Sequence, residues 1–370
     1  MSPHNHRAAL LGTAATRPAE TPPPVLIVGL PRSGTSWLGA VLSAIPGATY
    51  RFEPDNEGHQ ALARWAKQGL SRFPVLAPAD RQPRFALLWR LAFSGRPVSG
   101  PLDRVARRIS RLPGDRSRSE IRARSAVAGP TPTLLGYAPA SGLTPAERLR
   151  VSAAALLELA LHAPPPARRP AARVVKSVHA IGAVSWIAAR WPCRVIVIRR
   201  HPLAILASML QLGWGGPSPG DHLPRIDDGL VPAELLPPIA DAYAALLASA
   251  SDPDDARLIR LAALITVLLR LLATHALPHA AAVVDHEALC SDPAAEFAAL
   301  CAAVDLPMDP ALVARVAALD TPGDAPYGVR RDTASQVDRW RTTLGPERTA
   351  RALDAFAQIG LDLTTSPDRP

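Results

Sequence analysis

The residues best suited to chemistry form a loop at positions 29–36, with the sequence Gly-Leu-Pro-Arg-Ser-Gly-Thr-Ser. The apolar run Val25–Val28 precedes this loop and an apolar helical pattern follows it, which predicts a strand, a tight turn and a helix. Such a turn directs successive backbone N–H groups and a helix N-terminus at one point, an arrangement that binds phosphate-like anions. The loop therefore predicts an anion site.

The spacing of this loop is that of a nucleotide-binding P-loop, with Gly29 and Gly34 separated by four residues. A P-loop NTPase places a lysine directly after the second glycine, and here that position holds Thr35. The cation within the loop is instead Arg32. The residue types thus favour binding of an anion and argue against cleavage of ATP.

The rest of the chain predicts the sheet that would carry this loop. Short apolar strands alternate with helical segments, which is typical of a parallel sheet covered on both faces. We therefore expect a three-layer α/β fold with a central parallel sheet flanked by helices, similar to the P-loop NTPases. A single domain is predicted over residues 24–365, preceded by a disordered leader at residues 1–23.

Four polar residues follow predicted strands of this sheet. Ligands of parallel sheets bind beyond the carboxyl ends of the strands, so these four side chains are expected at one site. They are Arg32, Glu53, Lys176 and Arg200.

The composition limits the classes of partner. The 370 residues include 41 basic and 32 acidic side chains, a formal net charge of +9, and only Lys67 and Lys176 are lysines. The abundance of arginine favours the codon preference of a GC-rich genome as the origin of this charge. We expect no nucleic-acid partner, because no stripe of interleaved aromatic and basic residues is present. Lys67 is expected on the surface of a helix.

The cysteines and the most apolar segment indicate the cellular compartment of the protein. Cys193, Cys290 and Cys301 are too scattered for a disulfide framework or a zinc site, and each is expected to be a small core residue. The most apolar helical segment, residues 261–269, is far too short to span a membrane. These features predict a cytoplasmic protein. The oligomeric state stays open, with a homodimer as one arrangement.

Residues 96–145 differ from the rest of the chain. They hold nine arginines with many Pro, Gly and Ser residues. This composition favours a solvated amphipathic helix with a mobile loop. The alternative is a lid that covers the acceptor and becomes ordered on binding.

Several motifs, in order along the chain, resemble the sulfotransferases that use 3′-phosphoadenosine-5′-phosphosulfate (PAPS). Pro31–Trp37 resembles their 5′-phosphosulfate loop, and Arg200-His201-Pro202 with Ser208 resembles their 3′-phosphate motif. The likeness extends over roughly residues 24–362 and includes three further elements. These are Lys176–His179 with Trp191-Pro192, Asp285–Pro293, and Val337–Arg341.

The resemblance implies PAPS as co-substrate and PAP as product, with no metal. Arg32 and the loop would bind the 5′-phosphate, while Arg200 and Ser208 would bind the 3′-phosphate. The loop residues concerned are Ser33, Gly34, Thr35 and Ser36. Trp37 would stack on adenine, or it is a core residue of the loop helix. Arg330 and Arg331 would close over the 3′-phosphate, or they are a solvated pair.

The resemblance also implies in-line transfer of a sulfuryl group to a hydroxyl, with cations, Arg32 among them, holding the leaving phosphate. Lys176 would stabilise the leaving oxygen, a role suited to a compact ammonium. Two residues compete as the base. Glu53 follows Arg32 at the spacing of the catalytic glutamate in tyrosylprotein sulfotransferases. His179 lies three residues after Lys176, one more than in cytosolic sulfotransferases, and we favour Glu53.

The predicted function is therefore a PAPS-dependent sulfotransferase that forms a sulfate ester. A P-loop kinase or other nucleotide-dependent phosphotransferase is the alternative, and it would require a lysine at position 35. A non-catalytic nucleotide- or partner-binding protein is a third hypothesis. The acceptor is expected to be a small molecule or glycan, with carbohydrate, lipid and specialised-metabolite hydroxyls all open.

Overall fold

The computed structural model describes six stretches of the chain, namely residues 22–57, 60–95, 145–160, 170–214, 237–320 and 333–363. The predicted leader lies almost wholly outside these residues. So do the basic segment, apart from its last residue, and the pair Arg330 and Arg331.

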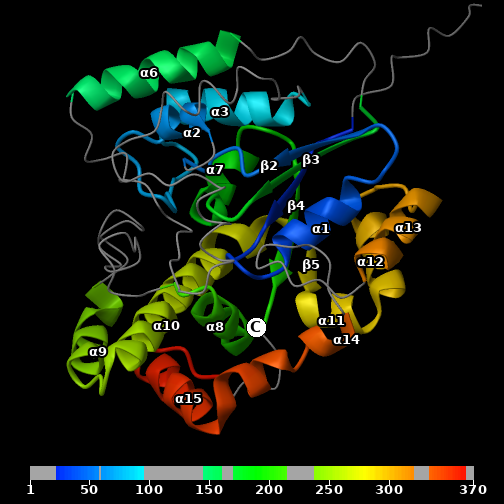
Figure 1. Ribbon diagram of the computed structural model, residues 1–370. Helices are drawn as coiled ribbons and strands as arrows, with labels where there is room; N and C mark the ends of the chain where they lie inside the picture. The colour runs from blue at the N-terminus through cyan, green and yellow to red at the C-terminus, as the bar shows by residue number, and fades with distance from the viewer. Residues whose placement is uncertain are drawn as a thin grey trace, which may run out of the picture.

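The described residues form a five-stranded sheet in which every pairing is parallel, with the order β2-β3-β1-β4-β5 (Figure 1). The central strand β1 is the apolar run before the glycine loop, and all four of its residues are buried. The sequence-based prediction of a parallel sheet is confirmed. The strands are β1 (Val25–Val28), β2 (Ala48–Phe52), β3 (Ala172–Ser177), β4 (Arg194–Arg199) and β5 (Ala280–Asp285).

Helices cover both faces of the sheet, because alternate side chains of each strand point to opposite faces. Val25 and Ile27 belong to one core and Leu26 and Val28 to the other. The first core lies against α1 (Thr35–Leu42), α12 (Pro293–Ala303) and α13 (Pro310–Leu319). The second lies against α2 (Ala61–Ala66), α3 (Pro83–Phe93), α7 (Val184–Ala188), α8 (Pro202–Gln211) and α10 (Pro253–Leu271). The fold is the expected three-layer α/β arrangement.

Around these layers, the described residues form five further α-helices (Figure 1). The helix α15 bends where Gly345 adopts a φ of 70° just before Pro346. None of the helices among the described residues combines the length and apolarity needed to cross a membrane. The five are α6 (Pro145–Ala160), α9 (Pro237–Ala248), α11 (His286–Ser291), α14 (Thr333–Gln336) and α15 (Arg339–Gln358).

Asp-Pro pairs begin three of the helices. Asp252 at α10, Asp292 at α12 and Asp309 at α13 each accept a hydrogen bond from a backbone N–H of the first helical turn. The proline that follows occupies the first helical position, where no N–H donor is needed. The local sequence thus fixes where these helices start.

The three cysteines are free thiols. Cys290 and Cys301 are buried in the core, and Cys193 is half-buried beside the second core. Burial raises the pKa of the Cys193 thiol to about 11. This placement agrees with the expectation that each is a small apolar packing residue.

Candidate active site

The glycine loop leads from β1 into α1 through two residues with left-handed backbone. Arg32 has a φ of 74° and Gly34 a φ of 98°. The Gly34 carbonyl accepts from the backbone N–H groups of Trp37 and Leu38, so α1 begins here. The N–H groups of Thr35 and Ser36, at the first helical positions, have no earlier helical carbonyl to bind. Strand, turn and helix therefore form the anion-binding geometry that the sequence predicts.

Gly34 is required by close packing as well as by its backbone. A Cβ atom at this position would lie 2.4 Å from Cδ2 of His286, which is the first residue of α11 and is fully buried. A contact this short does not occur between real side chains, so the glycine lets the loop rest directly on the imidazole ring. The sequence alone gave no indication of this support.

The chemistry of the loop fits an anionic group. The Ser33 hydroxyl is fully buried and has no hydrogen-bond partner among the residues that the structure describes. A buried polar group left in this state costs about 1–3 kcal/mol. The guanidinium of Arg32 and the free N–H groups of the helix start supply donors at the same place. An oxyanion would satisfy this donor set.

The two predicted phosphate motifs meet in the folded chain. Nε of Arg32 donates to Oγ of Ser208 at 2.9 Å, and Nη1 of Arg200 donates to the carbonyl oxygen of Arg32 at 2.9 Å. These pairs are 176 and 168 positions apart in the sequence. The parallel pairing of β1 with β4 brings them together, because both strands end at the same edge.

Residues from the end of β5, from α11 and from α15 brace the turn that carries Arg200. Arg199 makes a two-point hydrogen-bonded ion pair with Asp285, at 2.9 and 3.0 Å. Glu287 accepts from the backbone N–H of His201 at 3.0 Å. The His201 ring in turn stacks on Trp340, with centroids 5.0 Å apart and planes 8° apart. These elements belong to the motifs that resemble the sulfotransferases, but their bracing role depends on tertiary contacts that the motifs do not encode.

The second part of the site is the pair of Glu53 and Lys176. Lys176 Nζ forms a direct ion pair with Oε1 of Glu53, and both side chains are buried. The backbone N–H of Glu53 donates to the Lys176 carbonyl at 2.7 Å, continuing the pairing of β2 with β3. The Lys176 ammonium also lies 4.6 Å from the centre of the Phe52 ring. Glu53 has a φ of 45°, a strained conformation for a residue with a side chain.

Residues 53–57, here called the Glu53 loop, hold a buried polar network. Nδ2 of Asn56 donates to Oε2 of Glu53 at 2.6 Å, and the Ser177 hydroxyl donates to Asp55 at 2.6 Å. Burial raises the pKa of Asp55 to about 6, although Lys67 opposes the shift. The sequence offered no signal for this network beyond the rarity of asparagine, which occurs twice in the chain.

Lys67 is the main correction to the sequence-based predictions. It was expected on a helix surface, but its side chain is completely buried at the C-terminal end of α2. Its Nζ lies 2.8 Å from Oε1 of Glu57 and donates to the Arg72 carbonyl at 2.5 Å. Burial lowers the pKa of Lys67, and the charge of Glu57 partly offsets this effect. Its position depends on tertiary contacts that a helical pattern does not encode.

Two candidate residues are enclosed in the protein. The Trp37 ring is 1% exposed and packs edge-on against Phe297 and His286, so we leave it out of the proposed adenine contact. His179 is fully buried, its Nε2 accepts from Arg72 at 3.2 Å, and its ring packs against Phe73. His179 is 0% exposed and Glu53 is 7% exposed, so Glu53 is the more accessible of the two candidate bases. The roles predicted for Arg330 and Arg331 fall outside the described residues.

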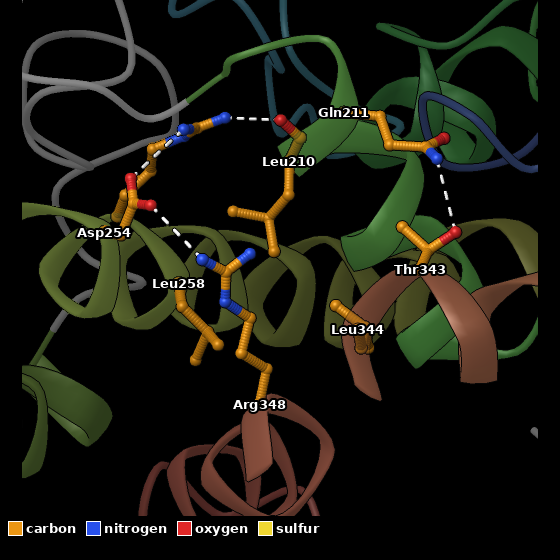
Figure 2. Close-up of a pocket in the computed structure, with 8 residues that line it drawn as sticks. Leu210, Gln211, Asp254, Leu258, Thr343, Leu344 and Arg348 are labelled. Carbon is orange, nitrogen blue, oxygen red and sulfur yellow. Dashed lines mark hydrogen bonds and ion pairs between the residues drawn. The ribbon is translucent and has the colours of Figure 1, made fainter. Parts of the chain in front are cut away.

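A separate hollow of about 130 Å³ lies between α8, α10 and α15 (Figure 2). Its lining contains none of the predicted site residues. Asp254 pairs with Arg348 at 3.3 Å, and Gln211 donates to Thr343 at 3.2 Å across it (Figure 2). The polar side chains that line the hollow therefore already bind one another.

The fold and these residues define a three-layer α/β protein with a P-loop-like anion loop on its central strand. A model of the sulfotransferase family, described by that name, matches residues 23–262. The chain therefore belongs to the sulfotransferase family. A comparison with curated proteins gives no match.

Solved structures with similarity to this chain include three bacterial-type sulfotransferases. The sulfotransferase domain from the curacin biosynthetic pathway is 13% identical with a TM-score of 0.38, and the alignment covers 91% of this chain and 98% of that one. The domain from the Synechococcus PCC 7002 olefin synthase is 15% identical with a TM-score of 0.38, covering 94% and 98%. Sulfotransferase STF1 from Mycobacterium tuberculosis H37Rv is 16% identical with a TM-score of 0.37, covering 88% and 76%.

Proposed function

We propose that this sulfotransferase uses PAPS as donor and transfers its sulfuryl group to a hydroxyl of a carbohydrate, lipid or specialised metabolite. The observation that carries the proposal is the buried Lys176–Glu53 pair at the same sheet edge as the anion loop. A cation for the leaving oxygen and a carboxylate for the acceptor proton are thus adjacent. The position of the NTPase lysine holds Thr35.

The donor would be held at both of its phosphate groups. The loop amides of residues 33–36 and the Arg32 guanidinium suit the 5′ end, because planar guanidinium groups bind phosphate oxygens at two points. Arg200 and Ser208 suit the 3′-phosphate, and their contacts with Arg32 join the two subsites. Bound PAPS would supply an activated sulfuryl group whose leaving group is a phosphate.

The chain's own residues would then manage charge and proton transfer. Oε1 or Oε2 of Glu53 takes the proton of the acceptor hydroxyl as its oxygen bonds to sulfur. Lys176 has three N–H donors, so its ammonium can contact the leaving phosphate oxygen while it stays near Glu53. The bond from sulfur to that oxygen breaks, and the products are a sulfate ester and PAP.

Binding and transfer measurements test the proposal. PAP without magnesium should raise the melting temperature of the protein, whereas ATP with magnesium should not. Radiolabelled PAPS should then deliver label to at least one of three acceptors, an N-acetylglucosamine oligosaccharide, a sterol or a simple phenol. Stabilisation by ATP with magnesium and none by PAP would instead support the phosphotransferase alternative.

A further inference from the structure

The Glu53 loop is held at both ends by the two lysines of the chain. Lys176 pairs with Glu53 at the start of the loop, and Lys67 pairs with Glu57 at its end. Both lysines are buried, in a protein with 39 arginines. A compact ammonium fits an enclosed site where a wide guanidinium does not. The loop is therefore a fixed element of the structure.

Asn56 lies within this loop and contacts Glu53 directly. Its Nδ2 donates to Oε2 of Glu53 at 2.6 Å, while Lys176 holds the other oxygen, Oε1. The Asn56 backbone N–H also donates to the Glu53 carbonyl at 3.1 Å, which closes a turn. Two donors on opposite oxygens fix the rotation of the carboxylate about its last bond.

We infer that Asn56 is a positioning residue that orients the Glu53 carboxylate for proton transfer, an inference that rests on the proposed function. Because the amide donates to a carboxylate oxygen, it favours the ionised form, which is the form that accepts a proton. Among the described residues, the charged or titratable groups that interact with Glu53 include Lys176 on β3, Tyr50 on β2 and Asp55 in the loop. Asn56 is neutral, so it can orient the carboxylate without competing for the proton.

The backbone of Glu53 explains why such a device is needed. Its φ of 45° is a strained conformation that persists only where surrounding contacts impose it. The Asp55–Ser177 hydrogen bond and the Lys67–Glu57 pair supply that restraint on the following residues. Asn56 converts the rigidity of the loop into a defined direction of the carboxylate.

The kinetic test compares two substitutions of this residue. Asn56→Ala removes the donor, and kcat for labelled PAPS with the acceptor found active should fall about tenfold or more, with the KM for PAPS unchanged. The acid limb of the pH–rate profile should move to higher pH. Asn56→Asp has the same shape but accepts rather than donates, so its acid limb should move further. Gln60→Ala, an amide at the start of α2 whose side chain does not cap that helix, is the matched control.

The outcomes separate positioning from simple packing. Asn56→Asp adds a negative charge beside Glu53 and shifts the profile whatever the role of Asn56, so Asn56→Ala decides the question. If Asn56 only fills space, Asn56→Ala should leave the pH–rate profile as in the parent, which would overturn the inference. A parallel loss of PAP binding in both variants would also overturn it. An unchanged profile in Gln60→Ala with shifted profiles in both Asn56 variants supports it.

A second measurement does not depend on any acceptor. Urea unfolding of Asn56→Ala is compared in the parent and in a Glu53→Gln background. Because hydrogen bonds to a charged group are about twice as strong as neutral ones, the loss of stability should be smaller in the Glu53→Gln background. Equal losses would overturn the inference. If no acceptor is sulfated at all, the proposed function fails while this cycle still decides whether Asn56 acts on Glu53.

Discussion

Nε of Arg32 lies 2.9 Å from the hydroxyl of Ser208, although 176 positions separate the two residues in the chain. One residue comes from the loop after β1 and the other from α8. The contact joins the two predicted phosphate subsites into one surface at the carboxyl edge of the sheet. Binding at either subsite should therefore depend on residues of the other.

The joined subsites predict a clear effect of Arg200→Lys. Lysine loses the planar guanidinium that reaches the Arg32 carbonyl, so the Kd for PAP should rise about 10- to 100-fold. Isothermal titration with PAP measures this change. Arg84→Lys, on the exposed face of α3, is the control and should bind PAP as the parent does. Equal affinity in both variants would remove Arg200 from the donor site.

Glu53→Gln should separate chemistry from binding. Glutamine keeps the shape of the side chain but does not accept the acceptor proton, so the transfer rate should fall by about 10²-fold or more. PAP should bind as before, because the proposal gives the carboxylate the acceptor proton and no contact with PAP. The control Glu347→Gln changes an exposed carboxylate on α15. Full activity of Glu53→Gln at neutral pH would mean that another group is the base.

Much of the site's framework follows from local sequence. The glycine loop and the strands at the sheet centre depend on neighbouring residues, and the structure contains them as predicted. Glu53, Lys176 and Arg200 were expected near one another because carboxyl ends of parallel strands share an edge. That rule needs only the order of the strands.

The supporting contacts could not be predicted, because each depends on how distant segments pack. Arg199 and Asp285 meet only because β4 pairs with β5. The tight turn accounts for a glycine at position 34, but the contact of Gly34 with His286 depends on where α11 packs. Lys67 was misplaced because the Glu53 loop and the backbone at Arg72 fold over the end of α2, which the helical pattern does not encode. Burial of a lone charged residue has no local sequence signal.

The packing of Gly34 predicts a difference between two glycines of positive φ. Gly34→Ala places a Cβ atom 2.4 Å from His286, whereas Gly69, with a φ of 85°, has nothing within 4 Å of its Cβ position. Both variants should lose about 1–2 kcal/mol through backbone strain. Gly34→Ala should lose about 1–3 kcal/mol more through overpacking. Urea unfolding measures both, and equal losses would show that the His286 contact relaxes freely.

Substitution of Asp55 should increase the stability of the folded protein by an amount that depends on pH. Its pKa of about 6 in the folded protein is above the ordinary value of 3.8, so the native state holds this proton more tightly than the unfolded state does. The associated stability is present below about pH 4 and is lost as the pH rises through 6. Asp55→Asn keeps an acceptor for Ser177 and should be more stable than the parent by about 1–3 kcal/mol at pH 8.

This gain should shrink as the pH is lowered towards 4.5, which distinguishes it from a general effect of removing a charge. Thermal unfolding across this range measures it. Asp241→Asn, at an exposed position of α9, should show no such trend. A gain that is the same at both ends of the range would contradict the assignment of the proton to Asp55.

Lys67→Arg keeps the positive charge but should still lower both the stability of the protein and its rate of sulfuryl transfer. The ammonium is fully buried between Glu57 and the Arg72 carbonyl, at 2.8 and 2.5 Å, and a guanidinium is too wide for this space. The free energy of unfolding should fall by about 1–3 kcal/mol through overpacking. Because Lys67 anchors the end of the Glu53 loop, transfer should fall as well, while PAP binding stays within about twofold. The control is Arg90→Lys, on the exposed face of α3. If Lys67→Arg is as stable and as active as this control, the loop needs only a positive charge at position 67.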